Sequence, residues 1–201
     1  MEFKKIQLNG FKSFADKTSL LIEDGLTGIV GPNGCGKSNI VESLRWCMGE
    51  TSAKSMRGSG MEDVIFSGTS NKPSKNIAEV IVNLSNDGSL GSHNYKHIPD
   101  IEIRRKIEKD KGSKFHINGK EVRAKDAQMF FADLSTGAHS PSLISQGRIG
   151  SLVTAKPSDR RAILEEAAGI SGLHARRHEA EVRLNAAENN LKRADELRRQ
   201  Q

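Results

Sequence analysis

The sequence predicts an α/β fold in which a β-sheet carries a phosphate-binding loop and leads into a long helix. Three observations support this prediction. Residues 31–38 read Gly-Pro-Asn-Gly-Cys-Gly-Lys-Ser and fit the phosphate-loop pattern G-x-x-x-x-G-K-[ST] at every fixed position. Short segments with alternating apolar residues lie on both sides of this loop, as expected for half-buried strands. Residues 173–201 contain neither glycine nor proline, which favours a long uninterrupted helix.

The phosphate-loop pattern carries weight only if a strand precedes it and a helix follows it. Residues 26–30 form a short, mostly apolar run that predicts a buried strand, and residues 39–50 place apolar side chains at roughly helical spacing. Gly31, Gly34 and Gly36 lack the Cβ atom that would block a positive φ or a close approach to a polyphosphate. The alternative is a glycine-rich turn between a strand and a helix, with an ordinary surface lysine.

The residue types of the loop suit a nucleoside triphosphate, and we expect ATP and Mg²⁺ as cofactors. Lys37 would place a positive charge on the β- and γ-phosphates, and the Ser38 hydroxyl would bind Mg²⁺ beside the positive end of the next helix. Further along, Gln146 follows a short apolar run and could orient attacking water and touch Mg²⁺, although alone it would be a surface turn residue. The residues expected to bind the nucleotide are Pro32, Asn33, Gly34, Cys35, Gly36, Lys37, Ser38 and Asn39.

The segments around the loop predict a sheet with an antiparallel layer. Residues 3–9 and 17–23 alternate as half-buried strands and come before the loop. Successive strands depart from the strict strand and helix alternation of a nucleotide kinase and suit an ATPase in which an antiparallel layer lies beside the phosphate-loop sheet. The later segments are expected to be a polar, glycine-rich loop at 51–60, strands at 64–66, 77–84 and 101–107, a hairpin at 115–122 with an Asn118-Gly119 turn, and a helix at 124–134.

Composition indicates one good hydrophobic core with an exposed appendage. The 201 residues are 35% hydrophobic and 28% charged, which is polar for a wholly globular chain. The apolar runs are only a few residues long, so we expect no membrane span, no signal peptide and a cytoplasmic protein. Cys35 and Cys47 have no metal-type spacing with histidine and are expected to be reduced thiols that fill space.

The formal net charge of +6 is concentrated in one part of the chain. Residues 96–125 contain ten Lys or Arg against five Asp or Glu, a net charge of +5. One interpretation is a surface that contacts the phosphate backbone of double-stranded DNA without reading its sequence, because no aromatic stacking platform accompanies it. The other is a solvated face of the predicted hairpin, and the sequence alone leaves both open.

From Ser158 onward the chain changes character, so we expect a domain at residues 1–157 and a helical extension at 158–201. Positions 173, 177, 180, 184, 187, 191, 194 and 198 step by four and three residues, and six of these eight are apolar. This spacing is the heptad pattern of a coiled coil, and an amphipathic helix that packs on the domain is the alternative. Because the pattern runs to the last residue without a stop signal, we expect a coiled coil that is cut short.

Several short motifs, in their order and spacing, closely resemble the N-terminal head segment of bacterial structural maintenance of chromosomes (SMC) proteins. Only the phosphate loop is specific by itself, but together the motifs cover essentially the whole chain. They are Gly10-Phe11-Lys12-Ser13-Phe14, residues 31–39, Met56-Arg57-Gly58 with residues 61–68 (Met-Glu-Asp-Val-Ile-Phe-Ser-Gly), Ile144-Ser145-Gln146-Gly147, and residues 165–170 (Glu-Glu-Ala-Ala-Gly-Ile).

The resemblance implies a P-loop ABC-type ATPase head that is split by a long antiparallel coiled coil. This chain would be the N-terminal lobe, a mixed sheet with an antiparallel β layer, followed by the start of the coiled-coil helix. The resemblance also implies three residue roles. Lys37 and Ser38 would bind phosphate and Mg²⁺, Gln146 would sense the γ-phosphate, and Arg57 would correspond to the arginine that the family places beside the nucleotide.

The resemblance further implies partners and a cellular role. The partners are double-stranded DNA, the C-terminal half of the same head, a second copy of the protein through head engagement and the distal hinge, and a kleisin subunit at the neck helix 173–201. The implied function is ATP-gated DNA binding in chromosome condensation and segregation, by a cytoplasmic, nucleoid-associated protein that does not contact the membrane.

Two motifs of such an ATPase are not found in this sequence. No apolar strand ends in the Asp-Glu pair of a Walker B motif, since Asp87 falls in a predicted turn, and the L-S-G-G signature is missing. Both belong to the C-terminal half, so we expect this chain alone to bind ATP weakly and not to hydrolyse it. Two other functions stay open: the head fragment of a RecN-like or RecF-like DNA repair ATPase, and a non-hydrolytic DNA-binding adaptor.

Overall fold

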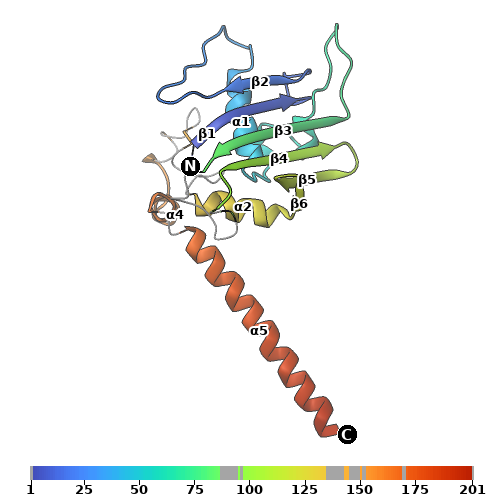
Figure 1. Ribbon diagram of the computed structural model, residues 1–201, viewed down its shortest axis with the longest axis vertical. Helices are drawn as coiled ribbons and strands as arrows, with labels where there is room; N and C mark the ends of the chain where they lie inside the picture. The colour runs from blue at the N-terminus through green and yellow to red at the C-terminus, as the bar shows by residue number, and fades with distance from the viewer. Residues whose placement is uncertain are drawn as a thin grey trace.

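A six-stranded sheet forms the centre of the computed structural model, which describes residues 2–86, 95, 97–134, 143, 144, 150, 153–168 and 171–200. Every pairing in the sheet is antiparallel, and the strand order is β2-β1-β3-β4-β5-β6 (Figure 1). The strands are β1 (Glu2–Asn9), β2 (Thr18–Leu21), β3 (Ile77–Ser85), β4 (Asp100–Glu108), β5 (Gly112–Ile117) and β6 (Lys120–Val122). This sheet is the antiparallel layer that the sequence predicts.

Two helices pack against the sheet, and a long helix leaves the domain. Helix α1 (Lys37–Cys47) contacts β3 and β4, and helix α2 (Ala124–Asp133) contacts β5. The 3-10 helices η1 (Lys54–Met56) and η2 (Met61–Val64) lie between α1 and β3 in the chain. Helices α4 (Pro157–Ala167) and α5 (Ser171–Gln200) follow, and α5 contacts α2 before it extends away from the domain (Figure 1). None of the helices in the described residues is long and apolar enough to cross a membrane.

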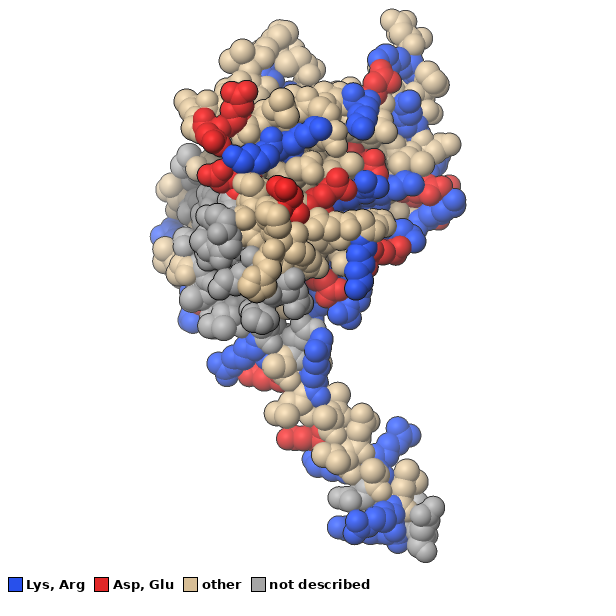
Figure 2. Space-filling model, in the orientation of Figure 1, with Lys and Arg blue, Asp and Glu red and all other residues tan. Residues whose placement is uncertain are grey.

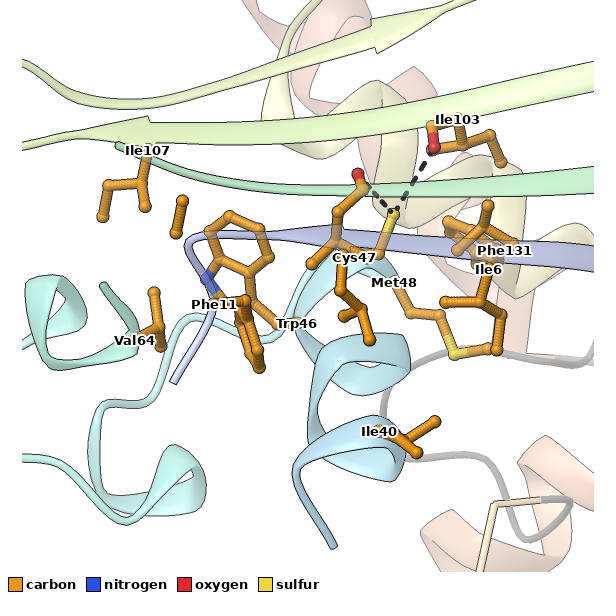
Figure 3. Close-up of a cluster of buried hydrophobic side chains, with 14 of the residues drawn as sticks. Ile6, Phe11, Ile40, Trp46, Cys47, Met48, Val64, Ile103, Ile107 and Phe131 are labelled. Atoms are coloured by element: carbon orange, nitrogen blue, oxygen red, sulfur yellow. Dashed lines mark hydrogen bonds between the residues drawn. The ribbon is translucent and has the colours of Figure 1, made fainter. Parts of the chain in front are cut away.

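The core between α1 and the sheet fixes the position of α1. Alternation along β4 turns Ile101, Ile103 and Ile107 inward, where all three are buried. On the helix side Trp46 is fully buried, and its ring lies 5.5 Å from the ring of Phe11 (Figure 3). Aromatic side chains of this size contribute most of the apolar area that a small core removes from water. The end of α1 is therefore anchored to the sheet.

Cys47 fills space in this core, as the sequence predicts. Its Sγ lies within 3.9 Å of the Val80 carbonyl oxygen and 3.7 Å of the Ile103 carbonyl oxygen, both on central strands (Figure 3). Burial raises the pKa of the Cys47 thiol to about 12, so the group stays neutral at ordinary pH. Cys35, in contrast, is exposed, and both cysteines are free thiols.

Most of the predicted elements are confirmed. The strands at 3–9, 17–23, 77–84 and 101–107, the helix after the phosphate loop and the helix at 124–134 all form. The turn between β5 and β6 has positive φ angles at both Asn118 (48°) and Gly119 (79°), as a type I′ turn requires. The predicted strand at 64–66 is wrong, because Val64 ends η2 and Ile65 makes only one bridge, to Phe11. The Ile65 N–H donates back to the Glu62 carbonyl oxygen, and two backbone bonds, Lys12 N–H to Val64 and Phe66 N–H to Gly10, join the segment to residues 10–12 without extending into a strand.

The predicted strand at 26–30 does not form either. Residues 22–32 are assigned no helix or strand, and Leu26 and Val30 are at least 94% exposed. A strand needs a neighbour to accept its hydrogen bonds, and within the described residues none lies beside this segment. Residues 26–30 therefore have the apolar composition of a buried strand but do not form one.

The heptad pattern lies on a helix, but the second helix that a coiled coil requires is not among the described residues. Helix α5 runs as one element from Ser171 to Gln200. Residues 180–194 are exposed throughout, including Leu184 and Leu191. The alternative interpretation, in which this helix packs along the domain, is therefore wrong for these residues, and the coiled coil stays a prediction.

One of the ten cations counted in the basic region belongs to the core instead. Arg105 is only 3% exposed, and its guanidinium lies 4.4 Å from the Trp46 ring centre and 4.6 Å from that of Phe115. It donates hydrogen bonds of 2.6 and 2.7 Å to the carbonyl oxygens of Trp46 and Glu50, at the negative end of α1. Burial lowers the pKa of Arg105 to about 10. Strand β4 is thus tied to the end of the phosphate-loop helix.

We expect Arg105→Met to destabilise the domain by about 2–4 kcal/mol, because it leaves two buried carbonyl oxygens without a donor. Lys106→Met, at the neighbouring position on the opposite face of β4, should change the unfolding free energy by no more than about 0.5 kcal/mol. Urea unfolding followed by the fluorescence of Trp46, the single tryptophan, measures both. Equal losses in the two variants would contradict the assigned role of Arg105.

Candidate nucleotide-binding site

The loop at 31–38 adopts a conformation that depends on glycine. Gly34 has φ 83° and Gly36 has φ 97°, in the left-handed region that other residues rarely adopt. A Cβ atom on Gly36 would lie 2.5 Å from the Ser13 Oγ, so a larger residue would displace that hydroxyl in addition to straining the backbone. Gly36 is the N-cap of α1 and forms no side-chain capping bond, and the first-turn N–H groups of a helix that lacks such a cap form an anion-binding arrangement.

Lys37 reaches back across this loop. Its Nζ donates to the carbonyl oxygens of Gly31 and Pro32, the latter at 2.7 Å, and lies 3.8 Å from the Cys35 Sγ. The ammonium group is therefore held by the backbone of the loop itself. Ser38 follows on the first turn of α1 with an exposed side chain. The loop thus brings together the eight residues that the sequence assigns to it, from Pro32 to Asn39.

A turn at residues 11–14 supports the loop from one side. The N–H of Phe11 donates to the Phe14 carbonyl oxygen, and the N–H of Phe14 donates back to the carbonyl oxygen of Phe11. Between them Ser13 Oγ accepts a 2.8 Å hydrogen bond from the Asn39 side-chain amide. Sequence reasoning quoted this motif as part of a family resemblance but assigned it no role. Its serine is a contact of the phosphate loop.

Arg57 lies against the first turns of α1. Its Nη2 donates to the Asn39 Oδ1 at 2.9 Å, and its Nε lies 2.5 Å from the Glu42 Oε1. A pocket of about 300 Å³ lies here, lined by Ser38, Val41, Glu42, Arg45, Ser55, Arg57 and Ile144. Gln146 lies outside the described residues, although Ile144, two positions before it, lines the same pocket.

Sequence reasoning missed Glu42, which is the acidic member of this site. The side chain is buried, and its two oxygens face Arg57 and Lys12. A signal was available, because Glu42 follows Ser38 by four residues and must share its helix face. No group of three or more His, Cys, Asp or Glu residues that could hold a metal ion occurs in the described part of the chain. For Mg²⁺, the protein ligands predicted from the sequence remain Ser38 and Gln146.

The basic region lies on β4, β5 and β6, where cations alternate with acids (Figure 2). Lys111 pairs with Glu108 at 2.6 Å, and Arg104 lies 3.2 Å from Glu102. Lys106 and Lys114 occupy directly opposite positions on β4 and β5. Like charges in such a pair repel one another, so an anion beside them would be favourable, and Lys114 also pairs with Glu121 at 3.2 Å.

Comparisons with known proteins identify a family that matches most of this chain. Residues 2–148 match the family described as RecF/RecN/SMC N terminal domain. The chromosome partition protein Smc of Cereibacter sphaeroides is 57% identical over 98% of this chain, and this chain spans only 17% of that protein's length. The chain therefore represents about a sixth of the curated relatives that it matches.

Solved structures lead to the same family. One, from work on ATP-driven dimerization and DNA-stimulated activation of SMC ATPases, superposes with a TM-score of 0.73 and 29% identity over 83% of this chain and 99% of that one. A second is an Smc head domain with an extended coiled coil, bound to the C-terminal domain of ScpA, derived from Pyrococcus furiosus. It gives a TM-score of 0.74 and 30% identity, and the match covers 97% of this chain and 48% of that one.

The sheet, the phosphate loop and the helix that follows it are those of a P-loop ABC-type ATPase N-terminal lobe. The chain belongs to the RecF/RecN/SMC N-terminal domain family, and its sequence is that of the N-terminal head segment of a bacterial SMC protein.

Proposed function

We propose that this chain is the ATP-binding half of an SMC head that acts in ATP-gated DNA binding and chromosome condensation and segregation. SMC proteins are ATPases, and the curated relatives are chromosome partition proteins. The observation that carries the proposal is the conformation of the phosphate loop. In this loop Gly36 packs against the Ser13 side chain, and the Lys37 Nζ donates a hydrogen bond to the Pro32 carbonyl oxygen. ATP would be bound by residues 32–39, with Lys37 on the phosphates.

Mg²⁺ would be held by Ser38 and Gln146, and the ion would neutralise charge on the β- and γ-phosphates. Arg57 already contacts α1, through a hydrogen bond to Asn39 and an ion pair with Glu42, and would contribute a second cation beside the nucleotide. Lys37, Arg57 and Gln146 are the residues that we propose to act on the triphosphate. Lys37 and Arg57 act by position and charge and Gln146 by position, which are what phosphoryl transfer requires of a protein.

The nucleotide site proposed here is composite. Residues 26–30 lead directly into the loop, and their apolar side chains are exposed. We propose that the C-terminal half of the head pairs with this segment as a strand and supplies the Walker B and signature motifs. The chain alone would then bind ATP and fail to hydrolyse it. Apolar exposure of this kind marks an interaction surface in a folded protein.

The other partners follow from the relatives. Smc heads dimerise in one solved structure and bind ScpA in another, which carries a coiled coil. We propose a kleisin subunit of that kind at α5, a second copy that engages through the heads and a distal hinge, and double-stranded DNA on the basic face. A cytoplasmic, nucleoid-associated protein would have access to the kleisin subunit, the second copy and the DNA.

Lys37→Ala should lower the affinity of the chain for Mg-ATP by about tenfold or more, because it removes the charged donor to the phosphates. Lys54→Ala, a change in an exposed lysine of η1, is the matched control and should leave the affinity unchanged. Isothermal titration calorimetry measures both. Binding that is indifferent to Lys37, or none at all, would refute the proposed site.

Replacing Leu26 and Val30 together by serine should abolish association with a C-terminal head half, for which that of the Cereibacter sphaeroides relative can be used. Wild-type chain plus this half should hydrolyse ATP above background, whereas the chain alone should not. Because both side chains are exposed, the double variant should unfold at the same urea concentration as wild type. Association and turnover that survive the double substitution would rule out pairing at residues 26–30.

Lys106→Ala with Lys114→Ala should weaken duplex DNA binding uniformly across sequences and reduce the slope of log K against log salt by about 1.8. Lys4→Ala, on β1 and paired with Asp24, is the control and should leave the slope unchanged. Fluorescence anisotropy at several salt concentrations gives the slopes. If the slope does not change, the face is simply solvated. DNA binding indifferent to ATP and to Lys37→Ala would instead favour the adaptor.

A further inference from the structure

Two residues near the phosphate loop have left-handed backbone conformations, and each lies in a short turn beside α1. Lys12 has φ 46° and Arg57 has φ 55°, in the left-handed region that non-glycine residues rarely adopt. The other non-glycine residues of this kind in the described part of the chain are Asp110 and Asn118, and both lie in hairpin turns. Lys12 lies in the turn at residues 11–14 and Arg57 is the C-cap of η1, so two tight turns bring these side chains to α1.

The side chains of these two residues converge on one carboxylate. Glu42 is 8% exposed, its Oε1 lies 2.5 Å from the Arg57 Nε, and its Oε2 accepts from the Lys12 Nζ. Lys12 makes a second contact, because its Nζ also donates to the carbonyl oxygen of Met56, the residue before Arg57. Lys12 therefore fixes both the carboxylate that binds Arg57 and the backbone from which Arg57 extends.

The arrangement leaves part of the Arg57 guanidinium available for an anion. A guanidinium has five N–H donors; one on Nη2 donates to the Asn39 Oδ1, and Nε forms an ion pair with Glu42. The rest have no partner among the described residues, and the Arg57 side chain is 59% exposed. Glu42 fixes the inner edge of the group while Asn39, next to Ser38, fixes its direction. The outer edge faces the pocket beside the phosphate loop.

We propose that Glu42 and Lys12 are positioning residues that hold the Arg57 guanidinium beside the phosphate loop before nucleotide binds. The proposal rests on the proposed nucleotide site, since Arg57 acts on the nucleotide there. A single buried carboxylate shared by two cations restricts both side chains more than an exposed ion pair would, because neither oxygen can rotate to solvent. Loss of the Glu42 charge releases Arg57 and leaves Lys12 with the Met56 carbonyl alone.

Nuclear magnetic resonance of the ¹⁵N-labelled 201-residue chain tests this directly through the Nε–H signal of Arg57, assigned from its loss in Arg57→Lys. In wild type this proton should exchange with water about tenfold more slowly than the Nε–H of the exposed Arg199 on α5. Glu42→Gln and Lys12→Met should bring it to the Arg199 rate. Lys12→Arg, which restores the cation, and Glu62→Gln, which removes a nearby exposed carboxylate, should keep the wild-type rate. The Trp46 fluorescence reports that each variant is folded.

Addition of Mg-ATP distinguishes the positioning role of Glu42 and Lys12 from nucleotide binding at the phosphate loop. In wild type the Gly36 amide and the Arg57 Nε–H should both shift, and in Lys37→Ala neither should. In Glu42→Gln the Gly36 amide should still shift while the Arg57 signal does not. A Gly36 amide that never responds overturns the proposed nucleotide site, and the exchange rates then decide the positioning role alone. Wild-type exchange or a wild-type Arg57 shift in Glu42→Gln overturns the positioning role and leaves the nucleotide site standing.

Discussion

A β-strand exists only where a neighbouring strand accepts and donates its backbone hydrogen bonds, and residues 26–30 have no such neighbour within the described structure. This constraint explains why the phosphate loop continues into a helix on one side, while the apolar run on its other side is exposed and forms no strand. The loop is anchored through α1 and through the 11–14 turn, while the segment that enters it contacts solvent. Under the proposed function, the site is half of a pocket that the C-terminal half of the head completes.

The C-terminal end of α1 fixes the position of the phosphate loop at its N-terminal end. Trp46 and Cys47 bury the last turn of α1 against the sheet, and Arg105 on β4 binds the carbonyl oxygens at its C-terminus. A helix of this length behaves as a rigid rod, so fixing its C-terminal end also fixes the direction of its N-terminal N–H groups. The antiparallel sheet thereby positions the proposed phosphate site, although none of its described strands enters that site.

Local patterns predicted much of the fold, and non-local contacts account for the errors. The apolar run at 77–84, the alternation in 101–107, the Asn118-Gly119 turn and the positive φ angles of Gly34 and Gly36 each depend on near neighbours, and these predictions are confirmed. Arg105 was counted with the basic surface because its partners, Trp46 and Phe115, are distant or on another strand. The Glu42 contacts with Lys12 and Arg57 join three separate segments, which no spacing rule connects. The strand at 26–30 failed because strand formation depends on the partner as well as on sequence.

Hydrogen–deuterium exchange of the amides of residues 26–36 tests the composite site most directly. The measurement compares the chain alone, with Mg-ATP, with a C-terminal head half, and with both together. The account predicts that protection of residues 26–30 rises about tenfold or more only when the C-terminal half is present, and that Mg-ATP adds protection at residues 31–36. Exchange in residues 26–30 that stays at the rate of the isolated chain with both partners bound would contradict it.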